Sequence, residues 1–151
     1  MSATPGLLEL AIRSLPHGPE FRFVDRMLSL APGREGVGEY RVRDEGFYSR
    51  GLPPGDPFLP AALLVEAGAQ VAGIVAQEDP AHPSLPHLKL TALRAVKILG
   101  SARPGETLRI EAVISGRLGS LVQAEVSAFI ANTKVLSAEL TLSGASHGGE
   151  R

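Results

Sequence analysis

A loop rich in proline and glycine runs directly into the longest helical pattern of the chain, and this stretch, residues 50–77, constrains the fold most. Proline fixes φ and lacks an N–H, and glycine allows left-handed backbone, so neither a helix nor a central strand is expected before Leu59. From Pro60, good helix formers continue for about eighteen residues, or roughly 27 Å. The sequence therefore predicts a shaped loop followed by a long central helix.

The composition of this helix indicates burial on nearly all sides. Small residues recur on one stripe, which would let the backbone of a sheet approach closely, and large aliphatic residues cover most of the remaining surface. Glycine costs about 1 kcal/mol relative to alanine inside a helix, so Gly68 and Gly73 predict close packing.

Glu66 and Gln70 are the polar residues of the helix between Pro60 and Gln77. They lie four residues apart and therefore share one face. A carboxylate in an otherwise apolar helix must reach a wet cavity or be paired, because its desolvation costs several kcal/mol. Glu66 is thus the first candidate for a catalytic residue.

Composition limits the class of protein. The 151 residues suffice for one domain with its own core. The absence of cysteine excludes a disulfide framework and a cysteine zinc site, and it is typical of a cytoplasmic protein. A formal net charge of −1 without a basic cluster does not suggest nucleic acid as a partner. We expect no membrane span or signal peptide, and the histidine spacing matches no metal site.

Strand patterns occupy most of the remaining chain. After a short amphipathic helix within residues 4–12, strands are expected over 21–30, 36–42, 87–99, 108–115, 121–130 and 134–142. Turns are expected at 31–35, 103–106, 116–119 and 131–133, and a surface connection at 78–86. This order predicts one α+β domain over residues 1–144, in which an antiparallel sheet wraps one helix, and a polar tail over 145–151.

Two motifs resemble the 3-hydroxyacyl-(acyl carrier protein) dehydratases of the FabZ and FabA type. The first is SLPHGPEFRFVDRM, residues 14–27, which meets the family's Leu-Pro-His, Pro, Phe and Val-Asp-Arg pattern. The second, residues 51–70, keeps the frame of the family's Gly-His-Phe-Pro-Gly-His-Pro pattern and of the apolar helix that follows, without a gap. The resemblance implies the hot-dog fold, an antiparallel sheet wrapped around one long central helix.

The second motif has lost both histidines of the family. Leu52 stands where the family has the general base that removes a proton α to the thioester, and leucine has no titratable atom. Losing a positioned base costs about 10²–10⁴-fold in rate. Asp56 stands at the second histidine and could serve as a catalytic group or as a cap for the helix. The family's helix carboxyl group, here Glu66, handles the departing hydroxyl.

The resemblance also implies that the loop and the first helical turn bind the acyl thioester. The amides of Ala61, Ala62 and Leu63 are expected to be free at the helix N-terminus, where a thioester carbonyl could be polarised. Ala61 replaces a family glycine, which narrows the approach of the acyl group. The candidate substrate-binding residues are Leu52, Pro53, Gly55, Phe58, Pro60, Ala61, Ala62, Leu63 and Gln70.

By resemblance, the substrate is carried on the phosphopantetheine of acyl carrier protein or coenzyme A, in fatty-acid or polyketide-type metabolism, with no further cofactor. An unpaired sheet edge predicts a homodimer or a higher oligomer. Three functions stay open at this point. The chain is a diverged or catalytically impaired dehydratase (a lyase), an acyl thioesterase that uses Glu66, or a non-catalytic subunit that pairs with an active dehydratase paralogue.

Overall fold

The computed structural model describes residue 8 and residues 21–43, 58–85 and 88–144. Within these residues the elements follow the order β1 (Arg26–Ala31), β2 (Glu35–Arg41), α2 (Ala61–Gln77), β3 (Lys89–Ile98), β4 (Thr107–Leu118), β5 (Leu121–Ile130) and β6 (Thr133–Ser143). The predicted α+β class is confirmed. The helix expected within residues 4–12 lies outside the described residues except for Leu8, and the tail over 145–151 lies outside them entirely.

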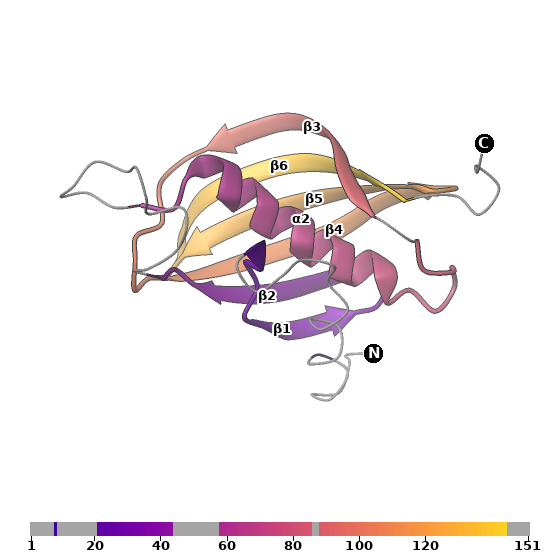
Figure 1. Ribbon diagram of the computed structural model, residues 1–151, viewed down its shortest axis with the longest axis horizontal. Helices are drawn as coiled ribbons and strands as arrows, with labels where there is room; N and C mark the ends of the chain where they lie inside the picture. Colours follow the sequence, from indigo (N-terminus) through magenta and orange to yellow (C-terminus); the bar gives the residue numbers. More distant parts are fainter. Residues whose placement is uncertain (1–7, 9–20, 44–57, 86–87, 145–151) are drawn as a thin grey trace.

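The strands form one antiparallel sheet in the order β1-β2-β4-β5-β6-β3. Figure 1 shows this sheet curving around α2, which lies across its concave face. The pairing of β2 with β4 joins residues far apart in the sequence, with Tyr40 opposite Leu108. Among the residues that the structure describes, β1 and β3 form the two edges of the sheet. The predicted arrangement, in which one sheet wraps one helix, is therefore confirmed.

The core lies between α2 and the concave face of the sheet. Alternate residues of β5 are buried, in keeping with the two-residue repeat of a strand. Twelve of the seventeen residues of α2 are buried, as its apolar composition predicts. The face of α2 that carries Gln70 is covered by residues 21–23, because the side chain of Gln70 bonds to their backbone.

Gly68 is the point of closest approach between helix and sheet. A Cβ atom built on Gly68 would lie 2.9 Å from Cγ2 of Val126, closer than two carbon atoms can pack. A Cβ atom on Gly73 would lie 3.6 Å from Cδ2 of Leu88, which is an ordinary van der Waals contact. The prediction of close packing is therefore confirmed for Gly68 and wrong for Gly73.

Two strand boundaries differ from the predicted ones by three residues or more. β1 begins at Arg26, not at residue 21. The amide of Phe23 and the carbonyl of Phe21 bond instead to the side chain of Gln70 on the helix. β4 continues to Leu118, and the expected turn at 116–119 is reduced to Gly119 and Ser120. Gly116 instead follows a β-bulge and pairs with Gln123. Gly116 therefore marks a β-bulge within the strand and not the predicted turn.

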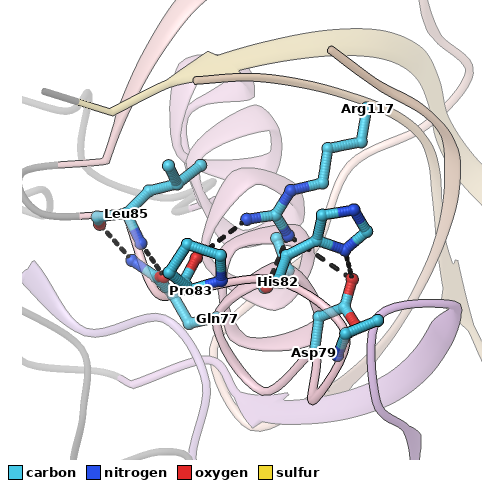
Figure 2. Close-up of polar contacts among 8 residues, drawn as sticks. Gln77, Asp79, His82, Pro83, Leu85 and Arg117 are labelled. Carbon is cyan, nitrogen blue, oxygen red and sulfur yellow. Dashed lines mark hydrogen bonds and ion pairs between the residues drawn. The ribbon is translucent and has the colours of Figure 1, made fainter. Parts of the chain in front are cut away.

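Arg117 of β4 fastens the C-terminal end of α2. Its Nη1 donates to the carbonyl of Ala76 at 3.2 Å, and its Nη2 donates to the carbonyl of Pro83 at 3.0 Å (Figure 2). Nη1 also lies 3.5 Å from Oδ2 of Asp79. One side chain therefore binds the helix end and the loop that follows it, and this matches the preference of cations for helix C-termini.

The connection after α2 is held by two further contacts. The side chain of Gln77 accepts a hydrogen bond from the amide of Leu85 at 2.8 Å and donates to its carbonyl at 2.6 Å. Nδ1 of His82 lies 2.7 Å from Oδ2 of Asp79. The expected surface connection is confirmed over residues 78–85, and Figure 2 shows how its polar side chains turn back toward the helix end.

Candidate functional site

The structure describes the helical half of the predicted site. Leu52, Pro53, Gly55 and Asp56 lie outside the described residues. The other candidates lie on α2 or just before it, and they are Phe58, Pro60, Ala61, Ala62, Leu63, Glu66 and Gln70. The described part of the site therefore comprises the start of α2 and the helix face that carries Glu66.

The start of α2 is fixed to the sheet by a backbone hydrogen bond. The amide of Leu59 donates to the carbonyl of Ala102 at 2.7 Å, just before β4. Leu59 is buried, whereas the neighbouring Phe58 is 38% exposed. Because Leu59 anchors the chain, Pro60 and the first helical turn keep a fixed place at the end of the sheet.

The first turn of α2 presents two amides. Within the described part of the chain, the amides of Ala61 and Ala62 have no hydrogen-bond partner, and both residues are exposed. The amide of Leu63 donates to the carbonyl of Pro60 at 2.8 Å, so the prediction that it is free is wrong. This hydrogen bond joins residues three apart, as in a 3₁₀-helix, and it tightens the first turn by using the amide of Leu63. The amides of Ala61 and Ala62 lie at the N-terminus of α2, which is the positive end of the helix dipole.

Glu66 lies one turn further along α2 and is half-buried. Its Oε1 accepts a hydrogen bond from Nε2 of Gln70 at 3.3 Å. The shared face that the four-residue spacing predicts is thus confirmed. A carboxylate is held among buried aliphatic residues by a side-chain donor of the same helix.

Gln70 is a buried polar residue, with only 2% of its surface exposed. Its Oε1 accepts a hydrogen bond from the amide of Phe23 at 2.7 Å, and its Nε2 donates to the carbonyl of Phe21 at 2.5 Å as well as to Glu66. The amide group of Gln70 is therefore engaged by the chain's own atoms. Sequence reasoning placed it among the substrate-binding residues and missed residues 21–23 as its partners.

A separate cavity of about 330 Å³ opens beside the end of β2. It is lined by Asp25, Arg41, Val42, Arg43 and Gly105 and by none of the predicted site residues. Asp25 accepts hydrogen bonds from the amide of Arg41 at 2.7 Å and from Nη2 of Arg43 at 3.2 Å. Its carboxylate thus offsets part of the positive charge of this cavity.

The described residues contain neither a metal-ligand cluster nor a membrane-spanning helix. No group of three or more histidine, aspartate or glutamate side chains there could hold a metal ion. None of the helices in this part of the chain is long and apolar enough to cross a membrane.

A curved antiparallel sheet around one long helix that carries a half-buried carboxylate defines a protein of the hot-dog fold. The chain belongs to the FabA-like domain family, whose model matches residues 15–139. The 3-hydroxyacyl-[acyl-carrier-protein] dehydratase FabZ of Chloroflexus aggregans is 32% identical over 126 residues, which are 83% of this chain and 87% of the relative.

Solved structures share the fold at lower identity. The dehydratase heterocomplex ApeI:P from Xenorhabdus doucetiae contains a chain with a TM-score of 0.76 and 17% identity, and the match covers 91% of this chain and 92% of that chain. Zebra fish thioesterase superfamily member 2 has a TM-score of 0.66 and 15% identity, with 89% and 91% covered. Family membership thus comes from the sequence match, and the solved structures support the fold.

Proposed function

We propose that this protein binds acyl thioesters carried on the phosphopantetheine of acyl carrier protein or coenzyme A, as a diverged FabZ-like dehydratase. The observation that carries the proposal is the Glu66 carboxylate, half-buried in an apolar helix and held by Gln70. Membership of the FabA-like family supports the class of substrate. A cytoplasmic location, expected from the cysteine-free composition, stays a prediction.

In this proposal the start of α2 receives the thioester. The amides of Ala61 and Ala62 stabilise negative charge that develops on the thioester oxygen. Glu66, in its protonated form, gives a proton to the 3-hydroxyl group, which leaves as water while the Cα–Cβ double bond forms. The α-proton needs a separate base, and Leu52 cannot supply one. Asp56 is the candidate within the chain, and catalysis is impaired if it does not replace the histidine.

A paired-subunit function is the second candidate. It is favoured by the leucine at position 52 and by the fold shared with a chain of a dehydratase heterocomplex. In such a pair, a histidine-bearing paralogue would contribute the base and this chain would contribute Glu66. Each chain alone would then lack one half of a dehydratase site.

Thioester hydrolysis is the third candidate, and the fold shared with a thioesterase superfamily member favours it. Glu66 in its ionised form would activate a water molecule for attack on the thioester carbonyl, and no histidine would be needed. The thiol would leave and a free acid would form. The products therefore distinguish this reaction from dehydration.

We further propose that two copies of the chain, or this chain and a paralogue, pair through the edge strand β3. Leu93 and Ile98 of β3 are each 46% exposed, although they lie opposite Leu140 and Leu136, which are buried. Residues opposite each other in an antiparallel pair point to the same face, so both side chains point to the helix side. An apolar row on an open edge favours pairing with another chain.

Binding can be tested apart from catalysis. A stable amide analogue of a 3-hydroxyacyl pantetheine would be titrated into isotope-labelled protein while backbone amide resonances are followed. The proposal expects the largest shifts at Ala61, Ala62 and Glu66. The same titration on the Glu66→Gln variant is the control for local charge. Shifts elsewhere on the sheet but none on α2 would overturn the proposed site.

A further inference from the structure

We propose that the charge of β3 selects a partner chain whose edge strand carries carboxylates, in preference to a second copy of this chain. The residues that make this selection are Lys89, Arg94 and Lys97, and together they form the basic row of β3. The proposal deepens the proposed function, because it rests on pairing through β3 and adds the charge that the partner must carry.

The basic row is not balanced by acidic residues of the same strand. Residues 80–105 include no aspartate or glutamate, and all three members of the row are exposed. Arg94 lies 3.7 Å from Glu139 of β6, which offsets part of its charge. Lys89 and Lys97 lie opposite serines of β6, and within the described part of the chain neither lysine forms an ion pair. β3 therefore presents a positively charged edge.

The two lysines lie on the face of the sheet turned away from α2. Opposite residues of an antiparallel pair point to the same face, and successive residues alternate between faces. The partners of Lys89, Leu93 and Lys97 on β6 are Ser143, Leu140 and Ser137. Leu140 is buried on the helix side, and the two serines lie an odd number of places from it, so both lysines point outward. The apolar residues of β3 and its lysines therefore occupy opposite faces of one edge.

Pairing of two identical copies would bring these positive charges together. Two copies that pair edge to edge are related by a two-fold axis, so the same contacts occur twice. Lys89 and Lys97 lie equally far before and after Leu93, both along β3 and along its pairing with β6. An axis through Leu93 therefore sets each Lys89 opposite Lys97 of the other copy. An axis through Arg94 sets the two Arg94 side chains opposite each other. Like charges opposite each other destabilise a strand pair, so the basic row opposes self-pairing.

An acidic edge strand removes this repulsion. Carboxylates opposite Lys89 and Lys97 would replace two repulsive contacts with two attractive ones. The apolar residues Leu93 and Ile98 can pack against either kind of partner. Because specificity is a difference between two affinities, the apolar residues supply the affinity and the basic row sets the choice of partner.

The first experiment uses a charge-reversed copy of the full chain, Lys89→Glu, Lys97→Glu, as the acidic partner. It is mixed in equal amounts with the mass-labelled, unaltered chain, and native mass spectrometry counts the mixed and the two identical dimers. We expect the mixed dimer to exceed its statistical share by about 10-fold in the dimer ratio. A statistical mixture would overturn the proposal.

The matched control places the same change of charge on the other edge of the sheet. Arg26 lies on β1 and Arg34 lies in the turn that follows, and both are exposed. The variant Arg26→Glu, Arg34→Glu should mix with the unaltered chain in statistical proportions. An equal preference for this control would show an effect of net charge alone and overturn the role of β3.

The second experiment measures self-association of the unaltered chain against salt. Raising the salt from about 0.05 to 0.5 M should tighten the dimer about 3- to 10-fold, because salt screens exposed charges. The neutral variant Lys89→Gln, Lys97→Gln should pair more tightly at low salt and lose most of this dependence. A dimer of the unaltered chain that weakens with salt, or the same dependence in both proteins, would overturn the proposal.

Leu93→Glu in both chains separates the two levels of the proposal. If the dimers survive Leu93→Glu, the proposed pairing through β3 fails and the selection by charge fails with it. If Leu93→Glu dissociates them while the reversed copy mixes statistically, the pairing stands and only the selection by charge is overturned.

Discussion

Asp79 and Arg117 form an ion pair at 3.5 Å although their side chains are only 12% and 10% exposed. The same carboxylate bonds to His82 at 2.7 Å and accepts from the amide of Ala81 at 2.8 Å. The pair lies where the end of α2 meets β4. It therefore joins the helix to the sheet at the end opposite to the candidate site.

Replacing Asp79 should weaken the fold at neutral pH. Burial raises the pKa of Asp79, but the hydrogen bonds from Ala81 and His82 and the charges of His82 and Arg117 outweigh it, so the pKa lies below 3.8. A pKa lowered by folding adds stability above the unfolded value, and this is lost as the pH falls through the folded pKa. We expect Asp79→Asn to lower the free energy of unfolding by about 1–3 kcal/mol at pH 7, and the difference should shrink below about pH 4.

Urea unfolding of both proteins at pH 7 and pH 3 measures this effect. The matched control is Glu139→Gln, which breaks an exposed pair with Arg94 at 3.7 Å and should cost less than about 1 kcal/mol. The same loss at both pH values in Asp79→Asn would contradict an electrostatic role for this carboxylate.

The two helix glycines should respond to alanine in opposite directions. Gly68→Ala gains about 1 kcal/mol of helix propensity, but its Cβ would overlap Val126, and overpacking costs about 1–3 kcal/mol. Gly73→Ala meets only an ordinary contact and should gain up to about 1 kcal/mol. Thermal and urea unfolding of the two variants should therefore place Gly68→Ala below Gly73→Ala in stability. The reverse order would refute the close approach at Gly68.

A charge on the open edge of the sheet should separate the subunits. Leu93→Glu would bury a carboxylate in the proposed β3 contact, so we expect a shift from dimer to monomer in size-exclusion chromatography with light scattering. Leu118→Glu is the control, since Leu118 is 80% exposed at the end of β4 and away from β3. A dimer that survives Leu93→Glu and dissociates in Leu118→Glu would place the interface elsewhere.

Restoring the family's histidine should raise dehydration. Leu52→His supplies the base that the family places there, and the expected gain is about 10²–10⁴-fold in the rate of water loss from a 3-hydroxyacyl thioester. The double variant Leu52→His, Glu66→Gln should lose that gain because the hydroxyl would leave without a proton donor. A single variant no faster than the unaltered protein would argue against a simple loss of the base.

The main architecture could be predicted because local pattern and packing agree. The helix over residues 61–77 is long, apolar and preceded by proline, and β5 alternates strictly, so both elements were found at nearly their true bounds. The failures share one cause. At residues 21–23 and at Gly116, backbone hydrogen bonds are decided by distant partners, and local sequence does not reveal them.

The candidate site shows the same limit. Glu66 could be selected from the sequence because a lone carboxylate in an apolar helix is unusual. The role of Gln70 could not, since its partners lie near the start of the chain. Arg117 gave no sequence signal either, because a single arginine in an alternating strand is indistinguishable from a surface residue until the end of α2 is placed beside it.

The central claim is that Glu66 acts at an acyl-thioester site, and mass spectrometry tests it most directly. Purified protein and its Glu66→Gln variant would be incubated with 3-hydroxyacyl thioesters on carrier protein and on coenzyme A, and loss of water and release of free thiol would be followed together. We predict slow loss of water by the unaltered protein and none by Glu66→Gln, with little free thiol from either. Loss of water at equal rates in both proteins would contradict the account, and release of thiol that depends on Glu66 would replace dehydration with hydrolysis.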